Sequence, residues 1–277
     1  MDPGEKKTLR EIEVSLLLEG IHQRYGYDFR DYAHASLRRR ISKCVADEKV
    51  RSVSGLQAKI LHDPHCMERF LNTVSISVTS MFRDPELYLS FRKNAVPQLR
   101  NLPFLRFWHV GCATGEEVYS MAILLQEEGL LEKCRLYATD ISGALLEQAR
   151  AGIFPAERMK EYTANYQKTG GAGTFSEYYT ARYDHVILKG DLKKNIVWSQ
   201  HNLATDASFN EFHVILCRNV MIYFNNSLAN KVHRLLLESL APRGYLCLGA
   251  RESLRFTAFE EEYEAVDEKQ RIYRRKK

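Results

Sequence analysis

The residues best suited to chemistry form a short glycine loop. Gly111 and Gly115 enclose three small residues, and Glu116 and Glu117 follow directly. Glycines let a ligand approach the backbone, and a loop of this kind between a strand and a helix holds cofactors in parallel sheets. The loop has neither the G-x-G-x-x-G spacing of dinucleotide sites nor the Gly-Lys-Ser/Thr of a P-loop. Two acids at a helix start would repel phosphate and attract a cation or an amine, unless they only favour the helix dipole.

A further acid, Asp140, ends the next apolar stretch of the chain. An acid in that position can bind both hydroxyls of a ribose, although it could equally be the N-cap of the following helix. A glycine loop unsuited to phosphate, acids beside it and a ribose-binding acid together indicate an adenosine ligand that carries positive charge. S-adenosylmethionine has this chemistry, because its amine and sulfonium are cationic and it contains a ribose.

A third motif, Leu-Cys-Arg-Asn-Val-Met-Ile-Tyr-Phe, occupies residues 216–224 at the end of another apolar stretch. In methyltransferases that act on amines, this part of the sheet often carries an Asn/Asp-Pro-Pro-aromatic run. The chain contains no Pro-Pro pair. This absence argues against a DNA exocyclic-amine methylase and against similar protein N-methylases.

The elements that must position these motifs alternate between strand and helix from residue 105 onward. Strands are predicted at 105–110, 135–139, 196–201, 213–217 and 245–248, and helices at 116–128, 143–151 and 227–241. Such alternation indicates a parallel, doubly wound sheet. Residues from about 153 to 190 break the pattern, because they are rich in Tyr and Thr around a glycine turn, and they predict a small antiparallel insertion.

The first hundred residues predict helices instead. The first expected helix covers about 9–25, where Leu9, Ile12, Leu16 and Ile21, helped by Leu17 and Leu18, recur at helical spacing. Further helices are expected at about 35–45, 53–62 and 67–74. The segment between His34 and Ile60 contains seven Lys or Arg residues and two acids, so its local net charge is +5. The whole chain also has a net charge of +5, which is not the excess of a nucleic-acid binder.

Composition limits the remaining possibilities. The chain has 277 residues, 45% of them hydrophobic and 27% charged, as in a globular protein of about two domains. No apolar run approaches the roughly 18 residues of a membrane span, and the start lacks the apolar core of a signal peptide, so we expect a cytoplasmic protein. The cysteines lack zinc-site spacing, and we expect Cys112, Cys217 and Cys247 to be reduced and buried. The histidines are scattered, and no metal is expected.

Two of these motifs resemble the CheR family, the chemotaxis-receptor methyltransferases, which convert receptor glutamates to methyl esters with S-adenosylmethionine. The resemblance rests on Gly111–Ser120 and on the highly specific run Cys217–Phe224. It extends over nearly the whole chain through Arg24–Phe29, Leu37–Ile41, Ser77–Asp84 and Gly249–Leu254.

The resemblance implies a role for each matched residue. Arg83 and Tyr223 would face the reacting carboxylate, Glu117 would bind the amine end of the methionine, and Asp140 would bind the ribose. The other residues implied to contact the cofactor are Ser77, Thr79, Arg83 and Gly111, together with Asn202, Leu203, Cys217 and Arg218 near the adenine. Without the family, Arg83 would more simply pair with Asp84 or Glu86, and Tyr223 would be a core aromatic.

The resemblance also implies the fold: a class I S-adenosylmethionine-dependent methyltransferase, α/β with a Rossmann-like doubly wound sheet, an N-terminal all-helical domain and a small antiparallel β insertion. The implied domains are 1–83, a linker 84–102 and a catalytic domain 103–277, with the insertion at about 153–190. The chain departs from the family at three positions. Ser77 stands where the family usually has Asn, Val118 stands where Pro is common, and Arg251 stands where a small residue or His is usual. The hydroxyl of Ser77 could still contact the cofactor.

The expected partner is the cytoplasmic helical domain of a chemotaxis receptor. The basic helix with Arg38, Arg39 and Arg40 would meet its acidic helices, whereas the simpler alternative is a solvated helix face. Neither nucleic acid nor direct membrane insertion is expected. Two other functions stay open: a carboxyl methyltransferase acting on a different protein or small molecule, and a non-catalytic sensor of S-adenosylmethionine. The presence of both Arg83 and Tyr223 argues against the sensor.

Overall fold

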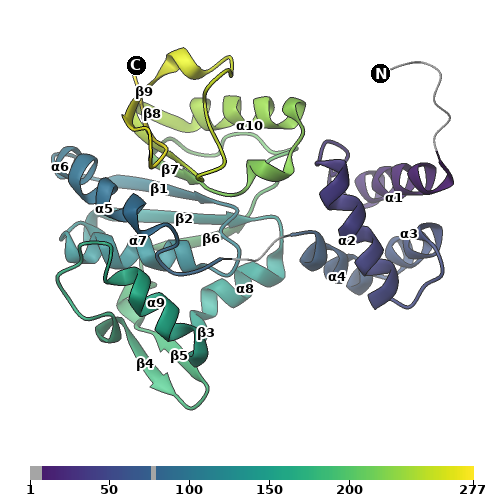
Figure 1. Ribbon diagram of the computed structural model, residues 1–277, viewed down its shortest axis with the longest axis horizontal. Coiled ribbons are helices and arrows are strands. Elements are labelled where there is room, and N and C mark those ends of the chain that lie inside the picture. The colour runs from purple at the N-terminus through teal and green to yellow at the C-terminus, as the bar shows by residue number, and fades with distance from the viewer. Residues whose placement is uncertain (1–7, 76–78) are drawn as a thin grey trace. The chain divides into compact units, whose positions relative to one another are not determined.

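The computed structural model describes residues 8–75 and 79–277, which form two compact units (Figure 1). The first unit contains residues 8–75 and two later segments, Asn202–Ala207 and Tyr223–Val232. The second contains residues 79–201, Ser208–Ile222 and His233–Lys277. No helix in the described ranges is long and apolar enough to cross a membrane. The domain boundaries expected from the sequence stay a prediction.

Four helices make up most of the first unit: α1 (Leu9–Tyr25), α2 (His34–Asp47), α3 (Val53–His62) and α4 (Pro64–Val74). Local sequence explains where they begin and end. Thr8 and Glu11 form a capping box at the start of α1, and Gly26 ends the helix with a φ of 78°. Ser52 caps α3 by accepting a hydrogen bond from the Gly55 N–H. All four helices match the predicted ones.

The buried face of α1 includes only part of the predicted apolar set. Leu17, Leu18 and Ile21 of that set are buried, together with Val14. Leu9, Ile12 and Leu16 were also in the set, but they are 75%, 43% and 54% exposed. Apolar residues occur on every side of this helix, so their spacing alone could not select the buried face. The packing of α1 against α3 selects it.

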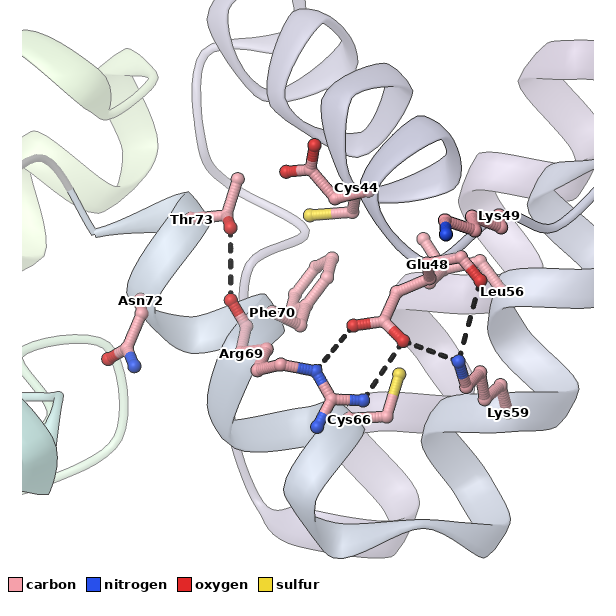
Figure 2. Close-up of a pocket in the computed structure, with 11 residues that line it drawn as sticks. Cys44, Glu48, Lys49, Leu56, Lys59, Cys66, Arg69, Phe70, Asn72 and Thr73 are labelled. Carbon is pink, nitrogen blue, oxygen red and sulfur yellow. Dashed lines mark hydrogen bonds and ion pairs between the residues drawn. The ribbon is translucent and has the colours of Figure 1, made fainter.

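An ion-pair cluster connects α2, α3 and α4 beside a cavity of about 480 Å³ (Figure 2). The Glu48 carboxylate lies 2.6 Å from Lys59 Nζ and 2.6 Å from Arg69 Nε. The hydrogen bonds from Arg69 and Lys59 lower the pKa of Glu48 to about 2. Cys44 and Cys66 also line this cavity. Because Lys59 and Arg69 both pair with Glu48, the cluster is a structural link between the three helices.

A seven-stranded sheet forms the centre of the second unit. Its spatial order is β6 (Ile196–Gln200), β2 (Cys134–Asp140), β1 (Leu105–Val110), β7 (Phe212–Cys217), β8 (Leu240–Leu248), β10 (Ile272–Arg275) and β9 (Tyr263–Asp267). The first five strands pair in parallel, and β10 runs antiparallel to both of its neighbours. Because β1 lies between β2 and β7, the carboxyl ends of these three strands meet at one edge of the sheet.

Helices cover both faces of this sheet, as expected for a doubly wound fold. Figure 1 shows α7 (Glu116–Glu127) and α8 (Gly143–Ala151) on one face and the C-terminal half of α10 (Asn226–Ser239) on the other. The expected linker forms two further helices, α5 (Pro85–Asn94) and α6 (Val96–Leu99). Leu87, Tyr88 and Phe91 of α5 belong to the same buried core as Phe107 of β1. This segment is therefore part of the packed second unit.

A small antiparallel sheet follows α8, where the insertion was predicted. Its spatial order is β3 (Ile153–Pro155), β5 (His185–Leu188) and β4 (Tyr179–Arg182), with α9 (Met159–Tyr166) between β3 and β4 in the chain. The antiparallel pairing confirms the predicted insertion, to which the structure adds α9. All six cysteines are free and buried, as predicted for Cys112, Cys217 and Cys247.

Candidate active site

The loop between β1 and α7 is a tight turn beside the ends of β2 and β7. Gly111 has a φ of 63° and Ala113 a φ of 48°, and the Cys112 N–H donates to the Thr139 carbonyl at 2.9 Å. A Cβ added to Gly111 would lie 2.8 Å from Cγ2 of Val220. The left-handed backbone and the close approach of Val220 both require glycine at position 111.

Asp140 ties this loop to the end of β2. The residue is 7% exposed, and its Oδ2 accepts the Ala113 N–H and its Oδ1 the Ser142 N–H, each at 2.9 Å. Burial raises the pKa of Asp140, although these N–H groups oppose the rise. The N-cap of α8 is Ser142, whose hydroxyl accepts the Leu145 N–H. The alternative in which Asp140 itself caps the helix is therefore wrong.

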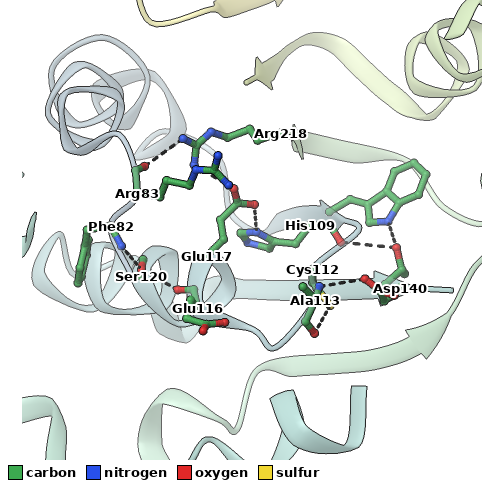
Figure 3. Close-up of polar contacts among 12 residues, drawn as sticks. Phe82, Arg83, His109, Cys112, Ala113, Glu116, Glu117, Ser120, Asp140 and Arg218 are labelled. Carbon is green, nitrogen blue, oxygen red and sulfur yellow. Dashed lines mark hydrogen bonds and ion pairs between the residues drawn. The ribbon is translucent and has the colours of Figure 1, made fainter. Parts of the chain in front are cut away.

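Glu117 is the acid that belongs to a charged cluster (Figure 3). Its Oε1 lies 3.0 Å from Nδ1 of His109, and its Oε2 lies 3.0 Å from Nη1 of Arg218. Burial raises the pKa of Glu117, but the His109 hydrogen bond and the Arg218 charge outweigh it, so the net pKa is lowered. The side chain is still 17% exposed. An ionised carboxylate in this position can accept a hydrogen bond from a further cationic group.

Arg218 connects the residues after β7 to the segment before α5. Its side chain is 2% exposed, and its Nη2 donates to the Arg83 carbonyl at 3.0 Å and to Asp84 Oδ2 at 2.7 Å. Burial lowers the pKa of Arg218, but the negative charge of Glu117 outweighs it and the net pKa is raised. Asp84 thus pairs with Arg218. Figure 3 places the guanidinium beside Glu117, whereas the family resemblance implied a position near the adenine.

Glu116, the neighbouring acid, makes different contacts. Its carboxylate accepts from the Thr114 hydroxyl at 2.6 Å and from the Tyr162 hydroxyl of α9 at 3.2 Å. Burial raises the pKa of Glu116. Of the two acids that open α7, Glu117 therefore faces the charged cluster, whereas Glu116 connects the helix to the insertion.

A buried acid that the sequence analysis missed holds the turn after β7. Glu252 is 5% exposed. Its Oε1 accepts from the Val220 and Met221 N–H groups at 2.9 and 2.8 Å. Its Oε2 accepts from the Asn219 and Gly249 N–H groups at 2.9 and 2.7 Å. One carboxylate therefore satisfies four main-chain donors and fixes the turn that carries Arg218.

Five of the predicted site residues lie in the second unit and take part in these contacts. Arg218 joins Glu117 to Arg83, and Asp140 accepts an N–H of the loop that begins at Gly111. Two others lie in the same unit. The carbonyl of Thr79 accepts from Arg158 Nη2 at 2.8 Å, and Cys217 is buried at the end of β7, where burial raises the pKa of its thiol. Ser77 lies outside the described residues. Within residues 8–75 and 79–277, no group of three or more His, Cys, Asp or Glu residues could hold a metal.

The other predicted site residues, Asn202, Leu203 and Tyr223, belong to segments of the first unit. Asn202 forms a local turn in which its Oδ1 accepts the Ala204 N–H at 3.0 Å, and Leu203 is half-buried beside it. The guanidinium of Arg40 lies over the Tyr223 ring, 4.9 Å from its centroid. Arg40 is therefore engaged with Tyr223 and is not part of a fully solvated helix face.

Comparison with known proteins defines the class to which this fold and site belong. Residues 77–272 match the family described as CheR methyltransferase, SAM binding domain, and residues 12–75 match CheR methyltransferase, all-alpha domain. The chain is therefore a methyltransferase with S-adenosylmethionine as its cofactor, and the predicted class I fold is confirmed. It belongs to the CheR methyltransferase family.

Curated relatives match along most of the chain. The protein named Putative methyltransferase Cher3 from Pseudomonas putida is 46% identical over 272 residues, which cover 98% of this chain and 99% of that one. A chemotaxis protein methyltransferase of Vibrio parahaemolyticus is 29% identical, with 94% of each chain covered. One from Listeria monocytogenes is 26% identical over 83% of this chain and 85% of its own.

Proposed function

We propose that this chain transfers the methyl group of S-adenosylmethionine to glutamate side chains of chemotaxis receptors in the cytoplasm. The products are glutamate methyl esters and S-adenosylhomocysteine, and the reaction is a step in signal transduction. Membership of the CheR family carries this proposal, and it is supported by relatives named chemotaxis protein methyltransferases.

The cofactor is proposed to lie along the loop after β1. Glu117 binds its ammonium group, because the lowered pKa keeps this partly exposed carboxylate ionised. Asp140 binds the ribose, since its carboxylate has acceptor capacity beyond the Ala113 and Ser142 N–H groups that it already accepts. Gly111 leaves the backbone open to the ligand. The remaining proposed contacts are Ser77, Thr79, Arg83, Asn202, Leu203, Cys217 and Arg218.

The proposed chemistry is an in-line displacement. When bound, S-adenosylmethionine supplies a methyl group on a sulfonium, which is already a good leaving group. The attacking glutamate oxygen is ionised near pH 7, so we assign no general base. The chain contributes position: Arg83 holds the carboxylate through its fork of donors, and the Tyr223 hydroxyl donates to one of its oxygens. The carbon–oxygen bond forms as the carbon–sulfur bond breaks.

Tritiated methyl transfer to purified receptor cytoplasmic domains tests the reaction. We expect base-labile label that disappears when the receptor's acceptor glutamates are changed to glutamine. Label on lysine, on a small molecule or on nothing would overturn the proposal, and the last result would favour a sensor of S-adenosylmethionine.

The role of Arg83 is tested by comparing turnover with affinity. Arg83→Ala is expected to lower kcat by about a hundredfold or more while changing the Kd of S-adenosylhomocysteine by less than about threefold. The measurements are initial rates at saturating cofactor and titration calorimetry. A loss confined to the Kd would contradict the assignment of Arg83 to the substrate carboxylate.

Receptor docking is proposed to use the exposed face of α2. Arg38 pairs with Glu11 at 2.8 Å, and Arg40 lies over Tyr223. Arg39 is exposed and has neither of these two contacts, so it is the arginine that we test. Arg39→Glu should raise the KM for the receptor several-fold at low ionic strength without changing the Kd of S-adenosylhomocysteine. Arg51→Glu, which changes an exposed charge outside α2, is the matched control. Equal receptor kinetics in both variants would remove α2 as the docking surface.

A further inference from the structure

His109 is a buried polar side chain in the middle of the sheet. It lies on β1, with Ala138 of β2 and Leu216 of β7 as its neighbours in the sheet register, and it is 0% exposed. Its Nε2 has no hydrogen-bond partner among the residues that the structure describes. Burying a polar atom without a partner is unfavourable. The unfavourable burial of Nε2 must therefore be offset by what the other ring nitrogen, Nδ1, contacts.

That other nitrogen contacts Glu117. His109 Nδ1 lies 3.0 Å from Glu117 Oε1, the contact that the dashed line between these two residues marks in Figure 3. The other oxygen, Oε2, lies 3.0 Å from Nη1 of Arg218. Because an ionised carboxylate only accepts hydrogen bonds, Nδ1 must carry the proton. The two contacts act on different oxygens, so together they fix both the position and the rotation of the carboxylate.

We propose that His109 is a positioning residue that orients the Glu117 carboxylate toward the amino-acid end of the cofactor. The inference rests on the proposed role of Glu117 as the ligand of the cofactor's ammonium group. Arg218 holds Oε2, and the Nδ1–H of His109 holds Oε1 from within the sheet. The remaining acceptor capacity of the carboxylate is thereby directed to the part of Glu117 that is exposed.

The proposal makes the effect of His109 specific to one end of the ligand. His109 acts through Glu117, so its loss should weaken only ligands that carry the amino-acid group. S-adenosylhomocysteine carries that group, whereas 5′-methylthioadenosine has the same adenosine without it. The ratio of the two dissociation constants therefore separates orientation of Glu117 from a general role in packing.

Three substitutions distinguish the contributions of the two ring nitrogens to ligand binding. The side-chain nitrogen of His109→Asn occupies the position of Nδ1, that of His109→Gln reaches toward the position of Nε2, and His109→Phe has neither. By titration calorimetry, we expect His109→Phe and His109→Gln to weaken S-adenosylhomocysteine by about tenfold and 5′-methylthioadenosine by less than about twofold. His109→Asn should bind both ligands nearly as well as the wild type.

Several results would overturn the inference. Equal losses for both ligands would show a packing role, and unchanged affinity for both would show no role. If His109→Phe failed to fold, His109→Asn and His109→Gln would still decide, because equal loss in these two variants contradicts a role for Nδ1. Glu117→Gln tests the premise. If Glu117→Gln weakens both ligands equally, the proposed role of Glu117 in binding the ammonium group is wrong. If Glu117→Gln weakens only S-adenosylhomocysteine and the His109 variants do not, the role of Glu117 stands and the role of His109 is rejected.

Discussion

Replacing Glu252 by glutamine tests how the turn after β7 is held. Each of the two carboxylate oxygens accepts two main-chain N–H groups, at 2.7–2.9 Å. Glutamine keeps one oxygen but presents an NH₂ group to the other two donors, so two hydrogen bonds are lost. A hydrogen bond to a charged group contributes about 1.5–3 kcal/mol, and the local stability of the turn should therefore fall by about 3–6 kcal/mol.

The assay is hydrogen exchange, followed by mass spectrometry, of peptides that cover residues 218–222 in the full chain. Because about 1.4 kcal/mol corresponds to a factor of ten, exchange of these amides should accelerate by about 10²–10⁴. Glu264→Gln changes an acid whose side chain is 54% exposed and is the matched control, which should leave these amides unchanged. If Glu252→Gln exchanged as slowly as the wild type, Glu252 would not hold this turn and the reasoning would be refuted.

Two further predictions concern stability and cofactor binding. Because the pKa of Glu48 in the folded protein, about 2, is below its ordinary value of 4.5, its stabilising contribution is present above about pH 4.5 and is lost as the pH falls toward 2. Thermal unfolding between pH 6 and pH 3 should thus depend less on pH in Glu48→Gln than in the wild type, and identical dependence would contradict this. Gly111→Ala should weaken S-adenosylhomocysteine binding by at least about tenfold, because a left-handed φ and the contact with Val220 both oppose a Cβ. Gly129→Ala, at a φ of 66° with no atom within 4 Å, is the control, and equal affinity in both variants would show that the contact is unimportant.

Elements with a clear local pattern could be predicted from the sequence. The strand Leu105–Val110 and the helix Val53–His62 have the predicted bounds, because an apolar run or apolar spacing is bounded by turn residues in each case. The insertion was found because its composition breaks the alternation of strand and helix. In contrast, α5 and α6 lie in a segment for which no helix was predicted, although Pro85 and Pro97 stand in the first turn of each helix, where proline is tolerated.

The sequence predicted many residues of the candidate site but not the contacts between them. Gly111, Glu117 and Asp140 carry local signals of a loop and strand ends, whereas the contacts that orient them join residues distant in sequence. Glu252 binds N–H groups about thirty positions earlier, from Asn219 onward, and no local pattern distinguishes it from a surface acid. His109 offered one signal, because it is a polar residue in an apolar strand and is separated from the glycine loop by Val110 alone. Only the fold shows that it faces Glu117.

The strand order of the large sheet also bears on how the chain folds during synthesis. β9 is made before β10, yet β10 lies between β8 and β9 and pairs with both. Until β10 has paired, β8 has an open edge and β9 has no strand to join. Such unpaired edges are sites of association between nascent chains. Completion of the sheet therefore waits for Ile272–Arg275, and the β8 edge is the region for which we expect chaperones to matter most.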